Sequence, residues 1–232
     1  ERFVGAHFFS PVWMMELIEI IRGKATGDAA VNNMLAVAAA LGKRPVVCND
    51  NPGFVVNAML FPYFIKAFDL LAEGVPMDKI DAAMMKFGLP VGPIRLTDEV
   101  GIYVSHLVLT KSLGMTPPVA LENVYRAGRY GRNKNGKGFY TAEGTPDPEV
   151  LPLLNPENRQ KEYSVAELQD MLFTPFVQTG HELLQKKVVS DPRSIDIGAI
   201  WGVGFPADKG GPMKWADLIG LSEKLYGKRF YH

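Results

Sequence analysis

The chain has 232 residues, of which 47% are hydrophobic, so it has room for one large or two modest domains with a substantial core. Its 25 lysine and arginine residues balance its 25 aspartate and glutamate residues, so no net charge draws it to nucleic acid or to an anionic membrane. The single cysteine, Cys48, excludes an internal disulfide, and no paired cysteines and histidines indicate a metal site. No uncharged apolar stretch approaches the roughly 20 residues of a membrane span.

The first part of the chain is predicted to be the end of a sheet. Residues 2–9 and 14–21 are rich in apolar side chains and are separated by a Ser-Pro break, which predicts two short strands. A helix is expected over 28–41, where apolar side chains follow the helical period and Gly42 supplies the stop. Residues 44–49 are the next extended segment, and no complete strand–helix–strand unit precedes the first strand.

The chain beyond residue 50 is predicted to be helical, with almost no strand signal. Pro52 suits the first turn of a long helix that runs to about Ala72, and Pro62 should kink this helix because it removes an interior hydrogen bond. Further helices are predicted over residues 78–87, 97–113, 118–127, 165–187, 192–201 and 212–225. The fold class is therefore mainly α.

Two parts of this helical region resemble each other in sequence. The first part contains Met59-Leu60-Phe61-Pro62, Asp81, Gly88-Leu89-Pro90, Pro93, Asp98 and Gly101. The second contains, in the same order, Met171-Leu172-Phe173-Thr174-Pro175, Asp196, Gly204-Phe205-Pro206, Pro212, Asp217 and Gly220. The offset drifts only from 112 to 119 residues, so the preserved order predicts a duplicated helical unit, with the polar, proline-rich residues 133–164 as the connection.

His7 and Glu19 are the most informative residues, because each is a titratable side chain inside an apolar run. Burying either one alone would cost several kcal/mol, so the two are expected to be partners. A carboxylate that orients a histidine and stabilises its imidazolium makes that histidine a general base. The alternative from the residues alone is a histidine that is satisfied within the core.

Two further polar features allow both a functional and a structural interpretation. Asn57 falls on the second turn of the helix predicted to open at Pro52, where a short amide suits either a buried partner or a solvent-facing turn. Five cations lie within twelve residues that contain no acid, which indicates either phosphate capture or a solvated loop. These cations are Arg126, Arg129, Arg132, Lys134 and Lys137.

A series of motifs matches a known family in order and spacing. The motifs are His7-Phe8-Phe9-Ser10-Pro11, Leu17-Ile18-Glu19-Ile20-Ile21, Gly42-Lys43-Arg44-Pro45-Val46-Val47, Asn51-Pro52-Gly53-Phe54-Val55-Val56-Asn57, Gly88-Leu89-Pro90-Val91-Gly92-Pro93 and Gly136-Lys137-Gly138-Phe139-Tyr140. Together they resemble the L-3-hydroxyacyl-CoA dehydrogenase part of the fatty-acid oxidation multifunctional enzymes. A second, weaker block of resemblance to this family covers the C-terminal third of the chain. It contains Gly202-Val203-Gly204-Phe205-Pro206 and Gly210-Gly211-Pro212.

This resemblance implies a domain order. Residues 1–49 would be the incomplete C-terminal end of a Rossmann-type NAD-binding domain, because the glycine-rich turn between a first strand and helix is missing. Residues 50–145 would be the first helical dehydrogenase C-terminal domain, and residues 146–232 a second, repeated one.

The resemblance also implies a reaction, namely oxidation of an L-3-hydroxyacyl-CoA to the 3-ketoacyl-CoA with NAD as the cofactor. His7 would be the general base and Glu19 its carboxylate partner, while Asn57 and Ser10 would contact the substrate oxygen. Ser10 departs from the commoner asparagine at its position. Lys134 is the best match to the family's cofactor-binding lysine.

The expected partners follow from the same resemblance. They are the acyl-CoA substrate, the remainder of a multifunctional polypeptide and a thiolase subunit, in a bacterial cytoplasm or a peroxisome. The chain alone is expected to be inactive, because it lacks the phosphate-binding turn. Two other functions stay open, a noncatalytic helical assembly module and a different β-hydroxyacid dehydrogenase. The latter class typically has a catalytic lysine on the long helix, where this chain has Asn57.

Overall fold

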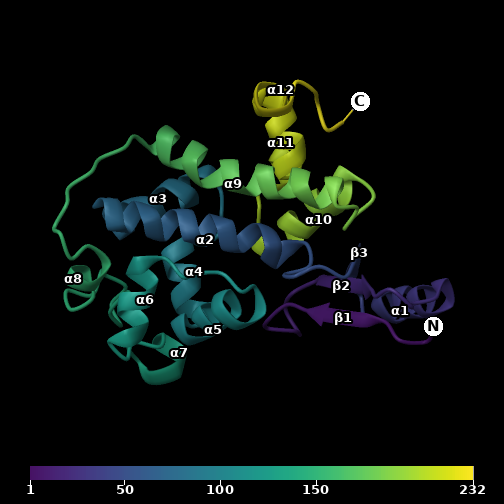
Figure 1. Ribbon diagram of the computed structural model, residues 1–232, viewed down its shortest axis with the longest axis horizontal. Helices are drawn as coiled ribbons and strands as arrows, with labels where there is room; N and C mark the ends of the chain where they lie inside the picture. Colours follow the sequence, from purple (N-terminus) through teal and green to yellow (C-terminus); the bar gives the residue numbers. More distant parts are fainter. Residues whose placement is uncertain (232) are drawn as a thin grey trace. The chain divides into compact units, whose positions relative to one another are not determined.

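The computed structural model describes residues 1–231 and places a three-stranded sheet at the N-terminal end (Figure 1). β1 (Gly5–Phe8) runs antiparallel to β2 (Leu17–Arg22), and β2 runs parallel to β3 (Arg44–Asn49). α1 (Asp28–Ala40) connects β2 to β3, as parallel strands require a crossover. The three extended segments and the helix predicted for this region are confirmed, although the first two strands are shorter than expected.

A small apolar core holds α1 on the sheet. It consists of Ile18 and Ile20 from β2 and Val31 and Ala38 from α1, all buried. Because side chains alternate across a strand, Glu19 points to the face opposite to these two isoleucines. The register of β2 therefore directs one carboxylate away from the core that attaches α1.

The rest of the chain is helical, as predicted. The helices are α2 (Val56–Glu73), α3 (Met77–Phe87), α4 (Pro93–Val100), α5 (Ile102–Leu107), the π-helical turn η1 (Val108–Ser112), α6 (Val119–Arg126), α7 (Arg132–Asn135), α8 (Leu151–Leu154), α9 (Val165–Gln185), α10 (Pro192–Val203), the 3-10 turn η2 (Ala207–Lys209), α11 (Pro212–Leu218) and α12 (Leu221–Tyr226). No helix within residues 1–231 combines the length and the apolar character needed to cross a bilayer.

The chain forms two compact units, which are described separately. One unit contains Glu1–Leu60 and the chain from Phe176 onward, and the other contains Phe61–Pro175. α2 and α9 each contribute to both units, and each carries an internal proline beside the boundary, Pro62 in α2 and Pro175 in α9. A helix-interior proline removes a backbone hydrogen bond, so both helices are weakened near the place where one unit gives way to the other.

The start of the long helix differs from the prediction. α2 begins at Val56 and not at Pro52, because the chain turns at Gly53 (φ 77°) and Phe54 (φ 50°). Both φ values lie in the left-handed region, which a right-handed helix cannot include. Because α2 begins at Val56, Asn57 lies on its first turn and not on its second.

Two predicted helices are interrupted at equivalent points. The helix expected over 97–113 is divided at Gly101 (φ 105°), and the helix expected over 212–225 is divided at Gly220 (φ 74°). Both predictions of a single helix were wrong, because helical periodicity on either side of a glycine does not show that its backbone has left the helical region. The interruptions occupy corresponding positions in the two similar parts of the sequence.

Candidate active site

The site is centred on the two residues that the sequence predicted to be partners. His7 on β1 lies directly opposite Glu19 on β2, and the distance from His7 Nδ1 to Glu19 Oε2 is 2.6 Å. The Glu19 side chain is fully buried, whereas 28% of the His7 side chain remains exposed. A carboxylate accepts a hydrogen bond from Nδ1–H, which leaves Nε2 as the basic nitrogen of the ring.

The second oxygen of Glu19 binds the start of α2. Glu19 Oε1 accepts hydrogen bonds from the backbone amides of Val55 at 3.0 Å and Val56 at 2.9 Å. Free amides at a helix N-terminus favour an anion, so these bonds satisfy a carboxylate that water does not reach. One buried side chain therefore connects the histidine on β1 to the first residues of α2.

Each of the two predicted substrate contacts lies close in the sequence to a residue that takes part in these hydrogen bonds. Asn57 follows Val56 directly and is half-buried on the first turn of α2. Ser10 is exposed and follows the end of β1, three residues after His7. The bond from Glu19 to Val56 thus fixes the backbone beside Asn57, while Ser10 lies on the loop that joins β1 and β2.

Two aromatic rings flank the imidazole, and sequence reasoning did not identify either of them as part of the site. The ring centroid of Phe9 is 4.7 Å from that of His7, and the ring centroid of Phe54 is 5.4 Å away. The turn formed by Asn51-Pro52-Gly53-Phe54 was the available signal, because it precedes the helix that carries Asn57.

The five cations between Arg126 and Lys137, here called the basic cluster, do not act as a single cationic surface. Arg129 is buried and is already bound by the carboxylates of Asp147 and Glu149 and the carbonyl oxygen of Gly138, so it is not a free phosphate ligand. Lys134 is exposed in the Phe61–Pro175 unit, with Nζ 5.4 Å from the ring centroid of Tyr103. Lys134 pairs with no carboxylate among residues 1–231.

A second histidine–carboxylate pair differs from the first in its access. His106 Nε2 lies 2.7 Å from Glu122 Oε2, and the His106 ring is stacked on Tyr125 with centroids 3.8 Å apart. The other ring nitrogen, Nδ1, is buried, so neither nitrogen of His106 can accept a proton from a substrate. His106 is therefore structural, whereas His7 has an exposed edge.

Cys48 does not supply a reactive thiol to the site. The Cys48 thiol is buried, and burial together with the nearby Glu19 carboxylate raises its pKa to about 12, which makes it unreactive as a nucleophile. Within residues 1–231, no group of three or more histidine, cysteine, aspartate and glutamate side chains could hold a metal ion.

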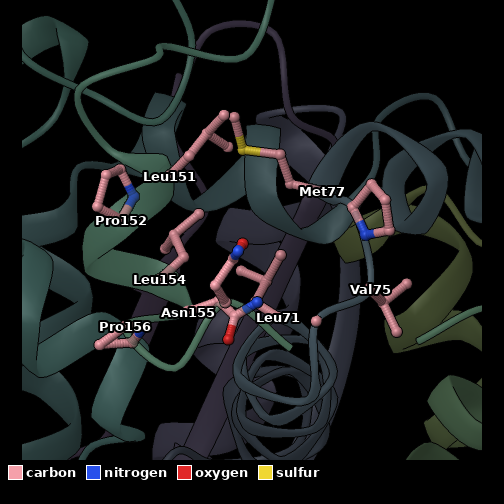
Figure 2. Close-up of a pocket in the computed structure, with 11 residues that line it drawn as sticks. Leu71, Val75, Met77, Leu151, Pro152, Leu154, Asn155 and Pro156 are labelled. Carbon is pink, nitrogen blue, oxygen red and sulfur yellow. The ribbon is translucent and has the colours of Figure 1, made fainter. Parts of the chain in front are cut away.

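The apolar pocket drawn in close-up offers no acid–base chemistry. It has a volume of about 450 Å³ and lies in the Phe61–Pro175 unit, between the end of α2 and α8 (Figure 2). Its walls are mainly leucine, proline, valine and methionine side chains, with the amides of Asn155 and Asn158, and none of its lining residues is charged. The candidate active site therefore rests on the His7–Glu19 pair.

Two family models match consecutive parts of this chain. Residues 1–51 match the model of the 3-hydroxyacyl-CoA dehydrogenase NAD binding domain, and residues 53–142 match the model of the 3-hydroxyacyl-CoA dehydrogenase C-terminal domain. His7 and Glu19 fall in the first match and Asn57 in the second. The chain belongs to the 3-hydroxyacyl-CoA dehydrogenase family.

Relatives of known name or structure extend the match over nearly the whole chain. The fatty acid oxidation complex subunit alpha of Pseudomonas aeruginosa is 39% identical over 96% of this chain, and this chain spans about a third of that protein's length. The dehydrogenase part of multifunctional enzyme 1 from C. elegans is 28% identical, with a TM-score of 0.65 over 97% of this chain and 56% of that chain. The 3-hydroxybutyryl-CoA dehydrogenase of Escherichia coli K12 shares the fold, with a TM-score of 0.76 over 99% of this chain and 68% of that chain, at 21% identity.

Proposed function

We propose that the chain supplies the general base and the substrate-orienting residues for NAD-dependent oxidation of an L-3-hydroxyacyl-CoA to a 3-ketoacyl-CoA. The observation that carries this proposal is the buried Glu19 carboxylate, which binds His7 through one oxygen and the amides beside Asn57 through the other. Such a bridge holds a base and a hydrogen-bonding amide in a fixed relation. Rate acceleration in this kind of site depends on that preorganisation.

In the proposed reaction, His7 Nε2 accepts the proton of the substrate's C3 hydroxyl group. The electron pair of the O–H bond forms the carbonyl bond as the C3 hydrogen leaves with its own pair as hydride. NAD supplies the hydride acceptor when bound. The buried Glu19 carboxylate stabilises the imidazolium that forms on His7, and in the reverse direction His7 returns the proton.

Asn57 and Ser10 are proposed to contact the oxygen on C3. An amide NH₂ and a hydroxyl group can both donate hydrogen bonds to an oxygen whose charge changes during the reaction. Asn57 is the better positioned of the two, because the bond from Glu19 to Val56 fixes the adjacent backbone. Ser10 is exposed and lies in a loop.

For the cofactor, we propose that Lys134 contacts an anionic group of NAD. Its ammonium group is at the surface beside Tyr103 and has no carboxylate partner in the described chain, so it is available to a phosphate. The remaining cofactor contacts are assigned to a NAD-binding domain. The acyl-CoA substrate, the remainder of a multifunctional polypeptide and a thiolase subunit are the proposed partners.

We also propose that the helical region is a duplication. In the first copy, the Asp81 carboxylate accepts hydrogen bonds from the amides of Ile94 and Arg95 and from the Tyr140 hydroxyl group. In the second, Asp196 accepts from the amides of Met213 and Lys214 and from the Tyr231 hydroxyl group.

Neighbouring positions support the same correspondence. A Cβ on Gly92 would overlap Asp81, and a Cβ on Gly211 would overlap Asp196, so both copies need a glycine where the carboxylate meets the next helix. Asp98 binds the amides of Phe139 and Tyr140, and Asp217 binds those of Phe230 and Tyr231. Three pairs of side chains with the same hydrogen-bonding roles, together with the paired glycines, favour descent from one helical unit.

The function is tested by His7→Gln in a polypeptide that also carries a complete nucleotide-binding turn. Turnover of an L-3-hydroxyacyl-CoA with NAD should fall by roughly 10²- to 10⁴-fold, the range typical of a positioned general base. The matched control is His106→Gln, which alters the other histidine–carboxylate pair and should leave the rate within a few-fold. Full turnover by His7→Gln would favour a noncatalytic assembly role for this chain.

A further inference from the structure

Phe54 has an unusual backbone conformation at the edge of the site. Its φ of 50° lies in the left-handed region, which an aromatic residue rarely adopts. Asn51 holds the turn: its carbonyl oxygen accepts from the Phe54 amide at 2.8 Å, and its side-chain Nδ2 donates to the Phe54 carbonyl oxygen at 3.1 Å. Strained residues that their neighbours hold in place occur preferentially at functional sites.

The left-handed turn explains how Glu19 is bound. Gly53 and Phe54 both have positive φ, and the two amides that follow them, those of Val55 and Val56, converge on one carboxylate oxygen, Glu19 Oε1. Successive amides arranged in this way form an anion-binding concavity. A helical conformation at Phe54 would change the direction of these two amides, because the backbone dihedrals of Phe54 set the orientation of the peptide that follows it.

The side chain of Phe54 reaches the other member of the pair. Its ring lies 5.4 Å from the His7 ring between centroids, at an interplanar angle of 52°. Phe54 therefore contacts the imidazole of His7 through its side chain, and its backbone directs the two amides that bind the Glu19 carboxylate.

We infer that Phe54 is a positioning residue for the His7–Glu19 pair. Its left-handed backbone aims the amides of Val55 and Val56 at Glu19, and Glu19 in turn fixes the His7 ring. The effect on rate rests on the proposed dehydrogenase function, whereas the effect on the His7 hydrogen bond does not.

Substitutions at Phe54 separate the backbone from the ring. Phe54→Gly removes the ring but adopts left-handed φ without strain, so the amide concavity is retained. Phe54→Val disfavours left-handed φ because it is β-branched, so the concavity is lost. Lys187→Gly is the matched control, because Lys187 also has a positive φ (55°) in the same compact unit but contacts neither His7 nor Glu19.

The first measurement is the NMR spectrum of the ¹⁵N-histidine-labelled chain, which has only four histidines. The His7 Nδ1–H resonance, assigned by its absence in His7→Gln, should persist in Phe54→Gly and Lys187→Gly and should be lost by exchange with water in Phe54→Val. Persistence in a folded Phe54→Val would overturn the inference. If Phe54→Val does not fold, Phe54→Ala is compared with Phe54→Gly, and equal exchange rates of Nδ1–H in these two would overturn it.

The second measurement is turnover in the polypeptide with a complete nucleotide-binding turn. Phe54→Val should lower kcat about 10²-fold with a smaller change in KM, since a misplaced base affects the chemical step, whereas Phe54→Gly should lose less than about tenfold. Full turnover by His7→Gln would refute the proposed function but leave the NMR result standing. An unchanged Nδ1–H in Phe54→Val would refute the positioning role alone.

Discussion

At the scale of single residues, the site depends on one carboxylate with two different partners. Glu19 is fully buried, yet each of its oxygens is bound, one by the His7 ring and the other by two amides of the turn before α2. A buried carboxylate without these partners would cost several kcal/mol. The same bonds that make its burial tolerable also determine which nitrogen of His7 is left without a proton.

Asn57 provides a test at this scale that is separate from the base. In the polypeptide that carries a complete nucleotide-binding turn, Asn57→Ala should lower kcat by roughly 10- to 10³-fold, with a smaller effect on KM. Removal of one hydrogen-bond donor to a developing charge has an effect of this size. The steady-state kinetics of substrate oxidation measure both parameters. A change confined to KM would show that Asn57 binds the ground state and the transition state equally and gives no added stabilisation to the charge that develops on the C3 oxygen.

At the scale of elements, helices α4 and α11 each begin on a buried aspartate from the preceding helix. Asp81 on α3 binds the first amides of α4, and Asp196 on α10 binds the first amides of α11. Burial outweighs these hydrogen bonds and raises the pKa of each carboxyl group from 3.8 to about 6. Because the folded pKa lies above the unfolded one, the contribution of each group to the free energy of unfolding falls as the pH rises from about 4 to 6.

Tyr140→Phe should therefore destabilise the protein in a pH-dependent way. The Tyr140 hydroxyl group donates to Asp81, and a hydrogen bond to the charged carboxylate is stronger than one to the protonated acid. We expect a loss of about 1–3 kcal/mol at pH 7.5 and a loss about 1 kcal/mol smaller at pH 5. Urea unfolding at the two pH values measures this difference, and equal losses would show that Asp81 has the same charge at both.

The sequence predicted most elements of this fold, because apolar periodicity is a local property. The strand that carries Glu19 and the middle of each long helix follow from it directly. The start of α2 could not be predicted, because it depends on bonds from Val55 and Val56 to a carboxylate 36 and 37 residues away. The left-handed Phe54 was equally hidden, since its residue type disfavours the conformation that the turn imposes.

The sequence predicted the central pair of the candidate site but not the surroundings of the basic residues. The His7–Glu19 pair follows from two titratable groups in apolar runs, and the structure brings them together at 2.6 Å. The basic cluster was harder to interpret, because a count of charges along the chain does not show that Arg129 is buried between two carboxylates. Pairing of that kind depends on residues 18 and 20 positions further along the chain.

At the scale of the whole molecule, the two compact units contain equivalent polar centres. The Asp81–Tyr140 pair belongs to the Phe61–Pro175 unit, and the Asp196–Tyr231 pair belongs to the unit that contains the candidate active site. Each pair lies among residues of its own unit.

Tyr140→Phe and Tyr231→Phe should consequently loosen different parts of the chain. Amide hydrogen exchange should show reduced protection in α3 and α4 for Tyr140→Phe, and in α10 and α11 for Tyr231→Phe, because local opening follows the contacts of each unit. Mass spectrometry of peptic fragments locates the change. Identical loss of protection in all four helices for both variants would contradict the division into two units.

The central claim is that Glu19 acts on the reaction through His7, and a double-mutant cycle tests it most directly. The test uses the polypeptide that carries a complete nucleotide-binding turn. Glu19→Gln keeps the size of the side chain but removes the anionic partner of the imidazolium, so kcat/KM should fall by about 10²-fold or more. With His7→Gln already present, the same substitution should cause less than about a threefold further loss, because the group through which it acts is gone. Independent losses that multiply in the double variant would contradict the account.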